Sequence, residues 1–292
     1  MLTLRWGSAT DVGRVRTLNE DSMLAVPGLF VVADGMGGHA AGEVASQLAV
    51  AEFARLAEQA PVRAEDVTEA VRLANEHILI AGAERGDRHG MGTTLTGVGV
   101  VGSERGEELA VFNVGDSRVY QLTAGQLHQL TVDHSAVQEL VDAGRLTARA
   151  ARTHPRRNVV TRSLGTDPGP APDVWLMQPV TGDRFLVCSD GLTGELEDAD
   201  IAALLAGNPD PQAAADQLVH QAVAAGGHDN VTAVVLDVVE VVTAQPSQQQ
   251  TATMPTADAG QAGATAVLPS GELPSGELPL TEPLPTAQQP PG

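Results

Sequence analysis

Two apolar runs in this chain lead into the same dipeptide, and this repeat constrains the fold more than any other feature. Leu29–Ala33 is followed by Asp34–Gly35, and Phe185–Cys188 is followed, one residue later, by Asp190–Gly191. Short apolar runs that end at turn residues predict buried strands. Each strand therefore presents a carboxylate next to a glycine, whose missing side chain lets other groups approach the backbone closely.

Around these runs, the pattern alternates strands with amphipathic helices. Apolar residues recur at helical spacing in segments 45–56 and 67–81, which predicts two helices that each lie on a sheet. Further strands are expected at 3–9, 23–26, 90–101, 109–114, 118–122, 174–177 and 231–239, and further helices at 135–143, 201–205 and 211–225. Segment 144–169 is irregular and rich in Arg, Thr and Pro, so we expect a long, mobile surface insertion with some short helix.

The charge balance argues against a nucleic-acid-binding protein. The 292 residues contain 37 Asp and Glu against 17 Lys and Arg, a formal net charge of -20 at pH 7, whereas nucleic-acid binders carry excess positive charge. Cys188 is the single cysteine, so no disulfide within the chain is possible. The first residues lack the features of a signal peptide, and no apolar run reaches the ~20 residues of a membrane helix. We predict a cytoplasmic protein without a membrane segment.

The composition changes near Thr243. The residues that follow are dominated by Pro, Gln, Thr, Ser, Gly and Ala, and one five-residue sequence occurs at 268–272 and again at 273–277. Such a segment buries too little apolar surface to offset its chain entropy. We therefore predict a folded domain over residues 1–242 and a disordered tail over 243–292, which is either an inert extension or a tether or phosphoacceptor.

Several acids share the setting of the two Asp-Gly pairs. Asp229, just before the last predicted strand, has the same setting as Asp34 and Asp190; Asp116 is expected at the tip of a hairpin, and Glu20–Asp21 lie in an N-terminal turn. Taken singly, each acid also fits an ordinary turn or surface residue. Ionised carboxylates can share one rim of a layered fold only if cations hold them together. The set is therefore either a site for a hard cation such as Mg²⁺ or Mn²⁺, or a group of unrelated turns.

Eight short motifs follow one another within residues 5–240. They are Arg16 with Asn19–Asp21, Asp34–His39, Gly92–Thr94, Asn113–Arg118, Asp133–Ser135, Thr161–Gly165, Ser189–Leu192 and Asp229–Thr232. In this order they resemble the metal-dependent Ser/Thr protein phosphatases of the PPM, or type 2C, family, in its bacterial branch. The predicted tail lies outside the resemblance, which makes residues 1–242 the implied catalytic domain.

The resemblance implies an α+β fold, a four-layer α-β-β-α sandwich of two antiparallel sheets flanked by helices. It also implies an enzyme that hydrolyses phosphoserine and phosphothreonine in proteins through a water or hydroxide bridging two metal ions, and that opposes protein kinases. Two metals neutralise the phosphoryl oxygens during an in-line displacement, so Cys188 need not be a nucleophile. The implied partners are phosphorylated Ser/Thr proteins, including kinases and their substrates, and we expect a monomer.

The same resemblance assigns the metal ligands, which would hold two Mn²⁺ or Mg²⁺ ions in a cleft at one end of the sandwich. Asp34 would bridge both ions, and Gly35 would lend a backbone carbonyl. Asp190 and Asp229 would hold one ion, and Glu20–Asp21 would act around the other, largely through waters.

Two further assignments concern the third metal and the substrate. Asp116, with Asp190, matches a third, weaker metal site of the bacterial branch. Arg16 matches the arginine that grips the substrate phosphate, for which a planar guanidinium is better suited than a lysine; nearby Arg14 is a weaker candidate. Segment 144–165 corresponds to the flap beside the cleft.

The chain departs from the animal members of the family at the general acid. They carry a histidine directly after the bridging Asp-Gly, and here that position is Met36. His39, three residues on, is the candidate general acid, or it only orients the turn, because a proton donor must reach the leaving oxygen. We interpret His134 as structural.

Two other functions fit the same residues less well. The first is a pseudophosphatase that binds phosphoproteins without hydrolysis, which the loss of metal-binding acids would favour, yet every expected acid is present. The second is a phosphatase for a phosphorylated anti-sigma-factor antagonist. That branch carries sensor domains ahead of the catalytic unit, and few residues precede Trp6 here.

Overall fold

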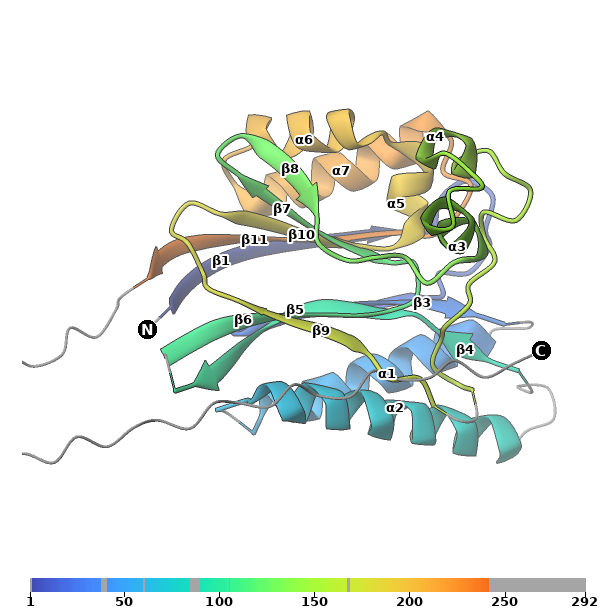
Figure 1. The fold of residues 1–292 in the computed structure, drawn as a ribbon, viewed down its shortest axis with the longest axis horizontal. Coiled ribbons are helices and arrows are strands. Elements are labelled where there is room, and N and C mark those ends of the chain that lie inside the picture. The colour runs from blue at the N-terminus through green and yellow to red at the C-terminus, as the bar shows by residue number, and fades with distance from the viewer. Residues whose placement is uncertain are drawn as a thin grey trace, which may run out of the picture. The chain divides into compact units, whose positions relative to one another are not determined.

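The computed structural model describes residues 2–37, 41–59, 61–84, 90–104, 106–166 and 169–241. His39 and the predicted tail over residues 243–292, with its boundary after residue 242, lie outside these ranges. In the described part, two β-sheets lie face to face between two layers of helices, which confirms the predicted α+β sandwich (Figure 1). None of the helices in these ranges is long and apolar enough to cross a membrane.

The first sheet has five strands in the order β1-β11-β10-β7-β8, and its neighbours pair antiparallel. The strands are β1 (Leu2–Asp11), β11 (Val231–Val241), β10 (Arg184–Cys188), β7 (Arg118–Thr123) and β8 (Gln126–Gln129). β1 and β11 pair along their whole length, from Leu2 opposite Val241 to Asp11 opposite Val231. The first and last strands of the folded part therefore lie side by side.

The second sheet has the order β2-β3-β5-β6-β9, with a short strand, β4, paired to β3. Its strands are β2 (Asp21–Val26), β3 (Leu29–Met36), β4 (Gly92–Thr93), β5 (Leu95–Ser103), β6 (Gly106–Val114) and β9 (Asp173–Met177). In this sheet β2 and β3 bring Asp21 directly opposite Asp34.

Helices cover the outer face of each sheet (Figure 1). The helices of the described residues are α1 (Ala41–Ala57), α2 (Ala64–Glu84), α3 (Ala136–Asp142), α4 (Ala148–Ala151), α5 (Asp190–Glu195), α6 (Asp198–Gly207) and α7 (Pro211–Ala225). α1 packs on β3 of the second sheet, and α7 packs on β1 and β11 of the first. α3 and α4 belong to the insertion between β8 and β9.

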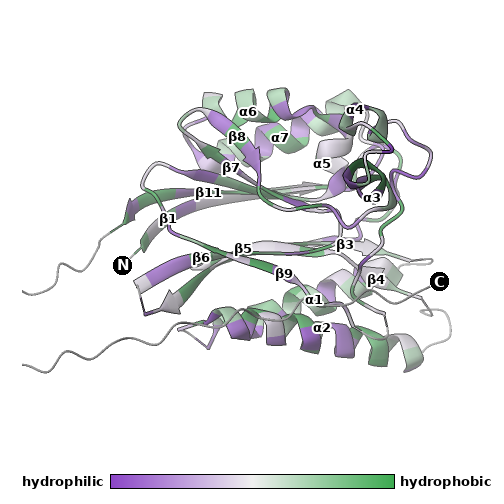
Figure 2. Cartoon of the chain, viewed as in Figure 1, coloured by the Kyte–Doolittle hydropathy of each residue, from purple (hydrophilic) through white to green (hydrophobic). Residues whose placement is uncertain are grey.

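The four layers enclose three apolar clusters, one between each pair of adjacent layers. Between the sheets, the rings of Trp6 and Phe30 meet edge to face at 5.5 Å. Between α1 and the second sheet, Phe53 and Phe112 stack at 5.1 Å. The three phenylalanines are fully buried, and each contributes about 1.5–3 kcal/mol. Figure 2 shows this apolar lining as green along the strands and on parts of the flanking helices.

The end of α7 places Asp229. Asp210 caps the helix by accepting a hydrogen bond from the Ala213 N–H at 2.9 Å, and Pro211 occupies its first turn. Beyond the helix, Gly227 has a φ of +59°, a conformation that glycine adopts without strain. The chain then reverses into β11, which leaves Asp229 in the turn between them.

Three expectations about local structure were wrong. Asp116 does not lie at a hairpin tip, because β6 pairs with β5 and β9, and β7 pairs with β10 and β8. Residues 115–117 instead cross from one sheet to the other. β3 does not end before Asp34 but continues to Met36, since β4 pairs with its glycine-containing end. The strand expected over 90–101 divides into β4 and β5 at Thr94, and β8 and α5 were not expected.

Candidate metal centre

Three predicted carboxylates meet where the ends of the two sheets adjoin. Asp34 lies near the end of β3, Asp190 begins α5 directly after β10, and Asp229 precedes β11. The side chains of Asp34 and Asp190 lie close enough to interact, and this contact lowers the pKa of Asp190 against the larger effect of burial. A Cβ added to Gly191 would lie 3.4 Å from the Cβ of Asp229 and only 2.0 Å from the Asn230 carbonyl oxygen. The second Asp-Gly pair therefore packs tightly against the Asp229 turn, and only glycine fits there.

The backbone around Asp34 is fixed by hydrogen bonds on both sides. The Asp34 N–H donates to Thr94 Oγ1, and the Asp34 carbonyl accepts from the Thr94 N–H, both at 2.9 Å. The Gly35 N–H donates to the Glu20 carbonyl at 3.2 Å. A Cβ on Gly35 would lie 2.2 Å from the Gly42 carbonyl oxygen. This glycine is required because three segments of backbone meet at it.

Asp21 is held by two hydroxyl groups from the opposite sheet. Its Oδ2 accepts from Ser189 Oγ at 2.8 Å and from Thr232 Oγ1 at 2.7 Å. Its Oδ1 is buried and has no hydrogen-bond partner among the described residues. An unpartnered buried carboxylate oxygen is costly, so this oxygen has the chemistry to accept a metal ion or a metal-bound water.

The carboxyl groups of the cluster disfavour one another's ionisation. Burial, followed by the neighbouring carboxylates, raises the pKa of Asp34, Asp116 and Asp190. Burial is also the largest cause that raises the pKa of Asp21, to about 7. Asp34 and Asp190 keep part of their surface exposed, yet the surrounding protein removes enough water to disfavour their charge. Bound cations would reverse this effect.

Arg16 is the cation that contacts this cluster. Its Nη2 donates to Asp229 Oδ2 at 2.8 Å, and about half of its side chain remains exposed. Arg14 instead donates its backbone N–H to the Gly227 carbonyl at 2.7 Å. The structure therefore brings Arg16, rather than Arg14, to the carboxylates.

Asn230 ties the N-terminal turn to the centre, a role that the sequence did not reveal. Its Oδ1 accepts from the Glu20 N–H at 2.8 Å, and its Nδ2 donates to the carbonyls of Val12 and Leu18 at 3.0 and 2.9 Å. The side chain of Glu20 is partly exposed beside the start of α1, where a Cβ on Gly42 would lie 2.7 Å from its Oε1. Glu20 thus adjoins the centre without entering the Asp21 hydrogen bonds.

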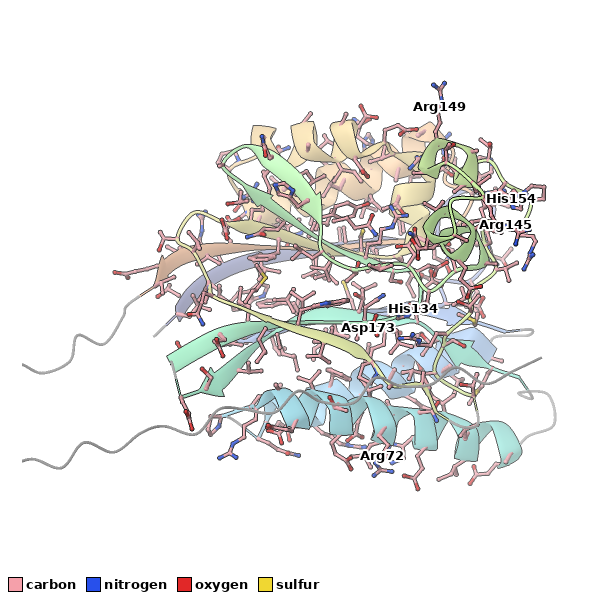
Figure 3. All side chains as sticks on the ribbon, viewed as in Figure 1. Arg72, His134, Arg145, Arg149, His154 and Asp173 are labelled. Carbon is pink, nitrogen blue, oxygen red and sulfur yellow. The ribbon has the colours of Figure 1, made fainter. Side chains whose placement is uncertain are left out.

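The turn that carries Asp116 is held by His134. Nδ1 of His134 accepts from the Gly115 N–H at 3.0 Å, and the His134 N–H donates to the Gly115 carbonyl at 2.9 Å. Because Nδ1 accepts, the ring proton lies on Nε2, which donates to Asp173 at 3.1 Å. Asp173 also accepts from Arg162 Nη1 at 2.7 Å. Figure 3 shows His134 beside Asp173.

This chain of contacts was missed by the sequence reasoning, which treated His134 as structural without naming partners. The sequence did mark both residues, since His134 lies in the motif Asp133–Ser135 and Arg162 in the motif Thr161–Gly165. Their contacts join residues far apart in the sequence, through a strand, β9, whose position at the edge of the sheet the sequence did not predict.

The described residues contain no group of three or more His, Cys, Asp or Glu side chains arranged to hold a metal ion as they stand. Mg²⁺ and similar ions, however, keep several waters and bind through only one or two carboxylates. Backbone carbonyls such as that of Gly35 also serve as ligands. The hard oxygen donors, the unpartnered Asp21 oxygen and the mutual repulsion of the carboxylates therefore fit divalent cations.

A cleft of about 660 Å³ opens beside the carboxylates. Asp116 and Asp190 lie in its lining, together with residues of α3, α4 and α5. The insertion between β8 and β9 thus borders the candidate centre, as expected for segment 144–165.

Comparison with known proteins gives a consistent result. The sequence profile described as Protein phosphatase 2C matches residues 14–222. The Serine/threonine protein phosphatase PstP of Mycobacterium tuberculosis (strain ATCC 25618 / H37Rv) is 42% identical over 241 residues, which are 82% of this chain and 46% of that protein. The Serine/threonine phosphatase stp of Listeria monocytogenes (serovar 1/2a) is 35% identical over 243 residues, 78% of this chain and 93% of that protein.

Solved structures agree. The catalytic domain of PstP in complex with two manganese ions has a TM-score of 0.76 and 40% identity, covering 82% of this chain and all of that one. The PPM phosphatase MsPP of Mycobacterium smegmatis, in complex with cacodylate, has a TM-score of 0.73 and 40% identity over 80% and 98% of the two chains. The chain spans about half the length of the PstP relatives that it matches. On the strength of the profile and of these identities, this chain belongs to the protein phosphatase 2C family.

Proposed function

We propose that this chain is a metal-dependent protein-serine/threonine phosphatase. The observation that carries the proposal is the convergence of Asp34, Asp190 and Asp229 from two sheets, with the guanidinium of Arg16 at their edge. Burial and neighbouring carboxylates raise the pKa of Asp34 and Asp190, which favours a cation there, and an exposed arginine beside them is suited to a phosphate dianion.

The donor set suggests how metal ions would be held. Asp34, Asp190 and Asp229 would share one ion, and Asp34 with the Gly35 carbonyl would hold a second. A pair of Mn²⁺ or Mg²⁺ ions supplies a nucleophile at neutral pH and neutralises the phosphoryl oxygens.

The remaining predicted acids act around these two ions. Glu20–Asp21 would order waters, and Asp116 with Asp190 would provide a third, weaker site. The two manganese ions bound by the PstP catalytic domain support the pair of ions, whereas the third site rests on the match of Asp116 and Asp190 to the bacterial branch.

The chain's own residues determine which groups could bind the phosphate, attack it or donate a proton to the leaving group. Arg16 would keep its contact with Asp229 while it binds a phosphoryl oxygen, because a guanidinium can bind both at once through different N–H groups. Cys188 is fully buried, and burial raises the pKa of its thiol to about 12, so a thiolate nucleophile is not available. Met36 cannot donate a proton. His39 stays a prediction as the general acid.

The wider assignments rest on the same site. We propose that residues 1–242 form the catalytic unit, that it acts as a monomer, and that it opposes Ser/Thr kinases by dephosphorylating them and their substrates. Relatives named as Ser/Thr phosphatases support the action on phosphorylated proteins. The disordered tail and the cytoplasmic location stay predictions from the sequence.

The test is phosphate release by the purified full chain from p-nitrophenyl phosphate and from phosphothreonine peptides, with and without Mn²⁺. We expect turnover only with metal, and at least a hundredfold loss in Asp34→Asn and Asp190→Asn. Asp216→Asn, on the exposed face of α7, is the matched control and should behave as the wild type. Full activity in both site variants would refute the assigned centre, and Mn²⁺ binding without turnover in the wild type would refute the activity.

A further inference from the structure

The insertion between β8 and β9 concentrates positive charge in an acidic chain. Residues 143–166 contain six of the 17 Lys and Arg residues and no Asp or Glu, although the chain carries a net charge of -20. Figure 2 shows the loop that follows α4 as hydrophilic. Figure 3 shows Arg145, Arg149 and His154 on this insertion, at the opposite side of the molecule from Arg72 on α2.

Part of this charge lines the cleft that reaches the candidate metal centre. Arg149, Arg152 and Arg157 belong to the same 660 Å³ cleft as Asp116 and Asp190. The cationic insertion and the carboxylates thus face a common space. Arg145, although close in sequence, is not part of the cleft lining.

Most other charges in this cleft are already neutralised by partners. Arg118 binds Asp133 with two nitrogens, the shortest contact being 2.7 Å from Nη2 to Oδ2. Arg152 pairs with Glu197 at 3.1 Å. Asp198 accepts a hydrogen bond from the Tyr120 hydroxyl at 3.2 Å, but a neutral hydroxyl does not cancel the charge of a carboxylate.

Arg149 and Arg157 are the cleft arginines for which no such partner is found among the described residues. Among the described residues, neither guanidinium forms an ion pair or a side-chain hydrogen bond, and both residues are exposed. When metal ions neutralise Asp116 and Asp190, these two arginines face a single unpaired carboxylate in the described cleft lining, that of Asp198, so the cleft carries a net positive charge. The cleft then favours a second anionic group beside the phosphate under attack.

We propose that Arg149 and Arg157 form a subsite for an anionic side chain of the substrate, either a second phosphate or a carboxylate. This inference rests on the proposed phosphatase function and specifies its substrate class: phosphoproteins with another negative charge near the phosphorylated residue. The planar guanidinium groups bind phosphate and carboxylate through paired N–H donors.

The size of the cleft limits where that second charge can lie. A rounded volume of 660 Å³ is roughly 11 Å across, which about three extended residues span at ~3.3 Å each. The anionic residue should therefore lie within about three residues of the phosphothreonine or phosphoserine.

The test compares three phosphothreonine peptides of one sequence with the Mn²⁺-loaded full chain. One peptide has neutral residues within three positions of the phosphothreonine, one has Asp two positions away, and one has a second phosphothreonine there. The readout is the ratio of kcat/KM for each anionic peptide to that for the neutral peptide. The two anionic peptides distinguish a carboxylate from a phosphate as the preferred group.

We expect the wild type to prefer at least one anionic peptide by about three- to tenfold, the range that two exposed charge pairs supply. The double variant Arg149→Gln/Arg157→Gln should bring the ratio close to one. Arg145→Gln, which removes the same charge from the same insertion outside the cleft, should retain it. Added salt should reduce the wild-type preference, because these charges are exposed.

Two results would overturn the subsite. One is a wild-type ratio near one for both anionic peptides, and the other is an equal loss of preference in Arg145→Gln, which would indicate a general charge effect. Hydrolysis of p-nitrophenyl phosphate by the wild type separates the two proposals. If it occurs without any preference among the peptides, only the subsite fails, and if no substrate is hydrolysed, the phosphatase function fails and the subsite with it.

Discussion

Asp21 and Asp34 lie directly opposite each other on the paired strands β2 and β3. Side chains at such positions have Cβ atoms about 4.5–5.5 Å apart, and like charges there are destabilising. The same two residues have raised pKa values, with burial as the largest cause in both. The fold therefore holds together two carboxylates that would separate in water, which gives a cation a role in stability as well as in catalysis.

We expect the stabilisation by metal to increase with pH. The pKa of Asp21 is raised to about 7 in the folded chain from 3.8, so between these values the folded state binds more protons than the unfolded state. Without metal, the free energy of unfolding therefore falls as pH rises through this window, by a few kcal/mol or roughly 5–10 °C in Tm. Metal binding needs deprotonated carboxylates and strengthens over the same window.

Thermal unfolding of the full chain with saturating Mn²⁺ and with EDTA, at pH 5 and pH 8, measures this effect. The difference in Tm between the two conditions should be clearly larger at pH 8. Asp21→Asn removes one titrating group and should flatten the EDTA curve. Equal differences at both pH values would contradict the prediction.

Gly35→Ala should destabilise the fold. The added Cβ would lie 2.2 Å from the Gly42 carbonyl oxygen and 2.5 Å from the Glu20 carbonyl oxygen. Both are backbone atoms, which cannot rotate away as a side chain could. Overpacking typically costs about 1–3 kcal/mol and occasionally more, and a contact this close to rigid backbone should fall at the upper end. Gly207→Ala, where no atom lies within 4 Å of the new Cβ, is the control and should change stability by less than about 1 kcal/mol. Urea unfolding measures both, and equal midpoints would show that the backbone gives way at Gly35.

His134→Ala should weaken the proposed third metal site more than the proposed main centre. The variant leaves the buried Gly115 N–H without its acceptor, at a cost of about 1–3 kcal/mol, and frees the turn that carries Asp116. We expect a lower Tm and a higher Mn²⁺ concentration for half-maximal activity, with kcat at saturating Mn²⁺ reduced less than fivefold. His128→Ala, exposed on β8, serves as the control. If the Mn²⁺ concentration for half-maximal activity is unchanged, His134 does not position Asp116 for metal binding.

Arg16→Gln should lower kcat/KM for p-nitrophenyl phosphate by about 10- to 100-fold, the value of charge-assisted hydrogen bonds to phosphate. Arg16→Lys should recover only part of this loss, because an ammonium group cannot bind two oxygens in one plane. Arg14→Gln keeps its backbone contact to Gly227 and should have near-normal activity. Similar losses in the Arg14 and Arg16 variants would show that net charge near the site, rather than geometry, matters.

Local features of the chain were predictable from the sequence, and contacts between distant segments were not. The amphipathic spacing in segments 45–56 and 67–81 marks α1 and α2, since periodicity is a property of neighbouring residues. The motif order marked Asp34 and Asp190. The predicted hairpin at Asp116 was wrong because a hairpin and a crossing between sheets can have the same local sequence. Only the pairing of β6 with β5 and β9 distinguishes them.

The same limit explains what was missed at the site. The contact of His134 with Gly115 and the pairing of Arg152 with Glu197 each join segments whose distance in space depends on the whole fold. Charge balance in the cleft, which singles out Arg149 and Arg157, appears only once these partners are known.

The full-length pairing of β1 with β11 has a practical consequence for protein engineering. β11 begins beside Asp229 and runs 11 residues to Val241, which is roughly 35 Å at about 3.3 Å per residue. A reporter or affinity label joined after Val241 therefore starts a strand's length from the carboxylates. It could return to the cleft only through a linker of at least about ten extended residues, so short fusions at this position should leave substrate access open.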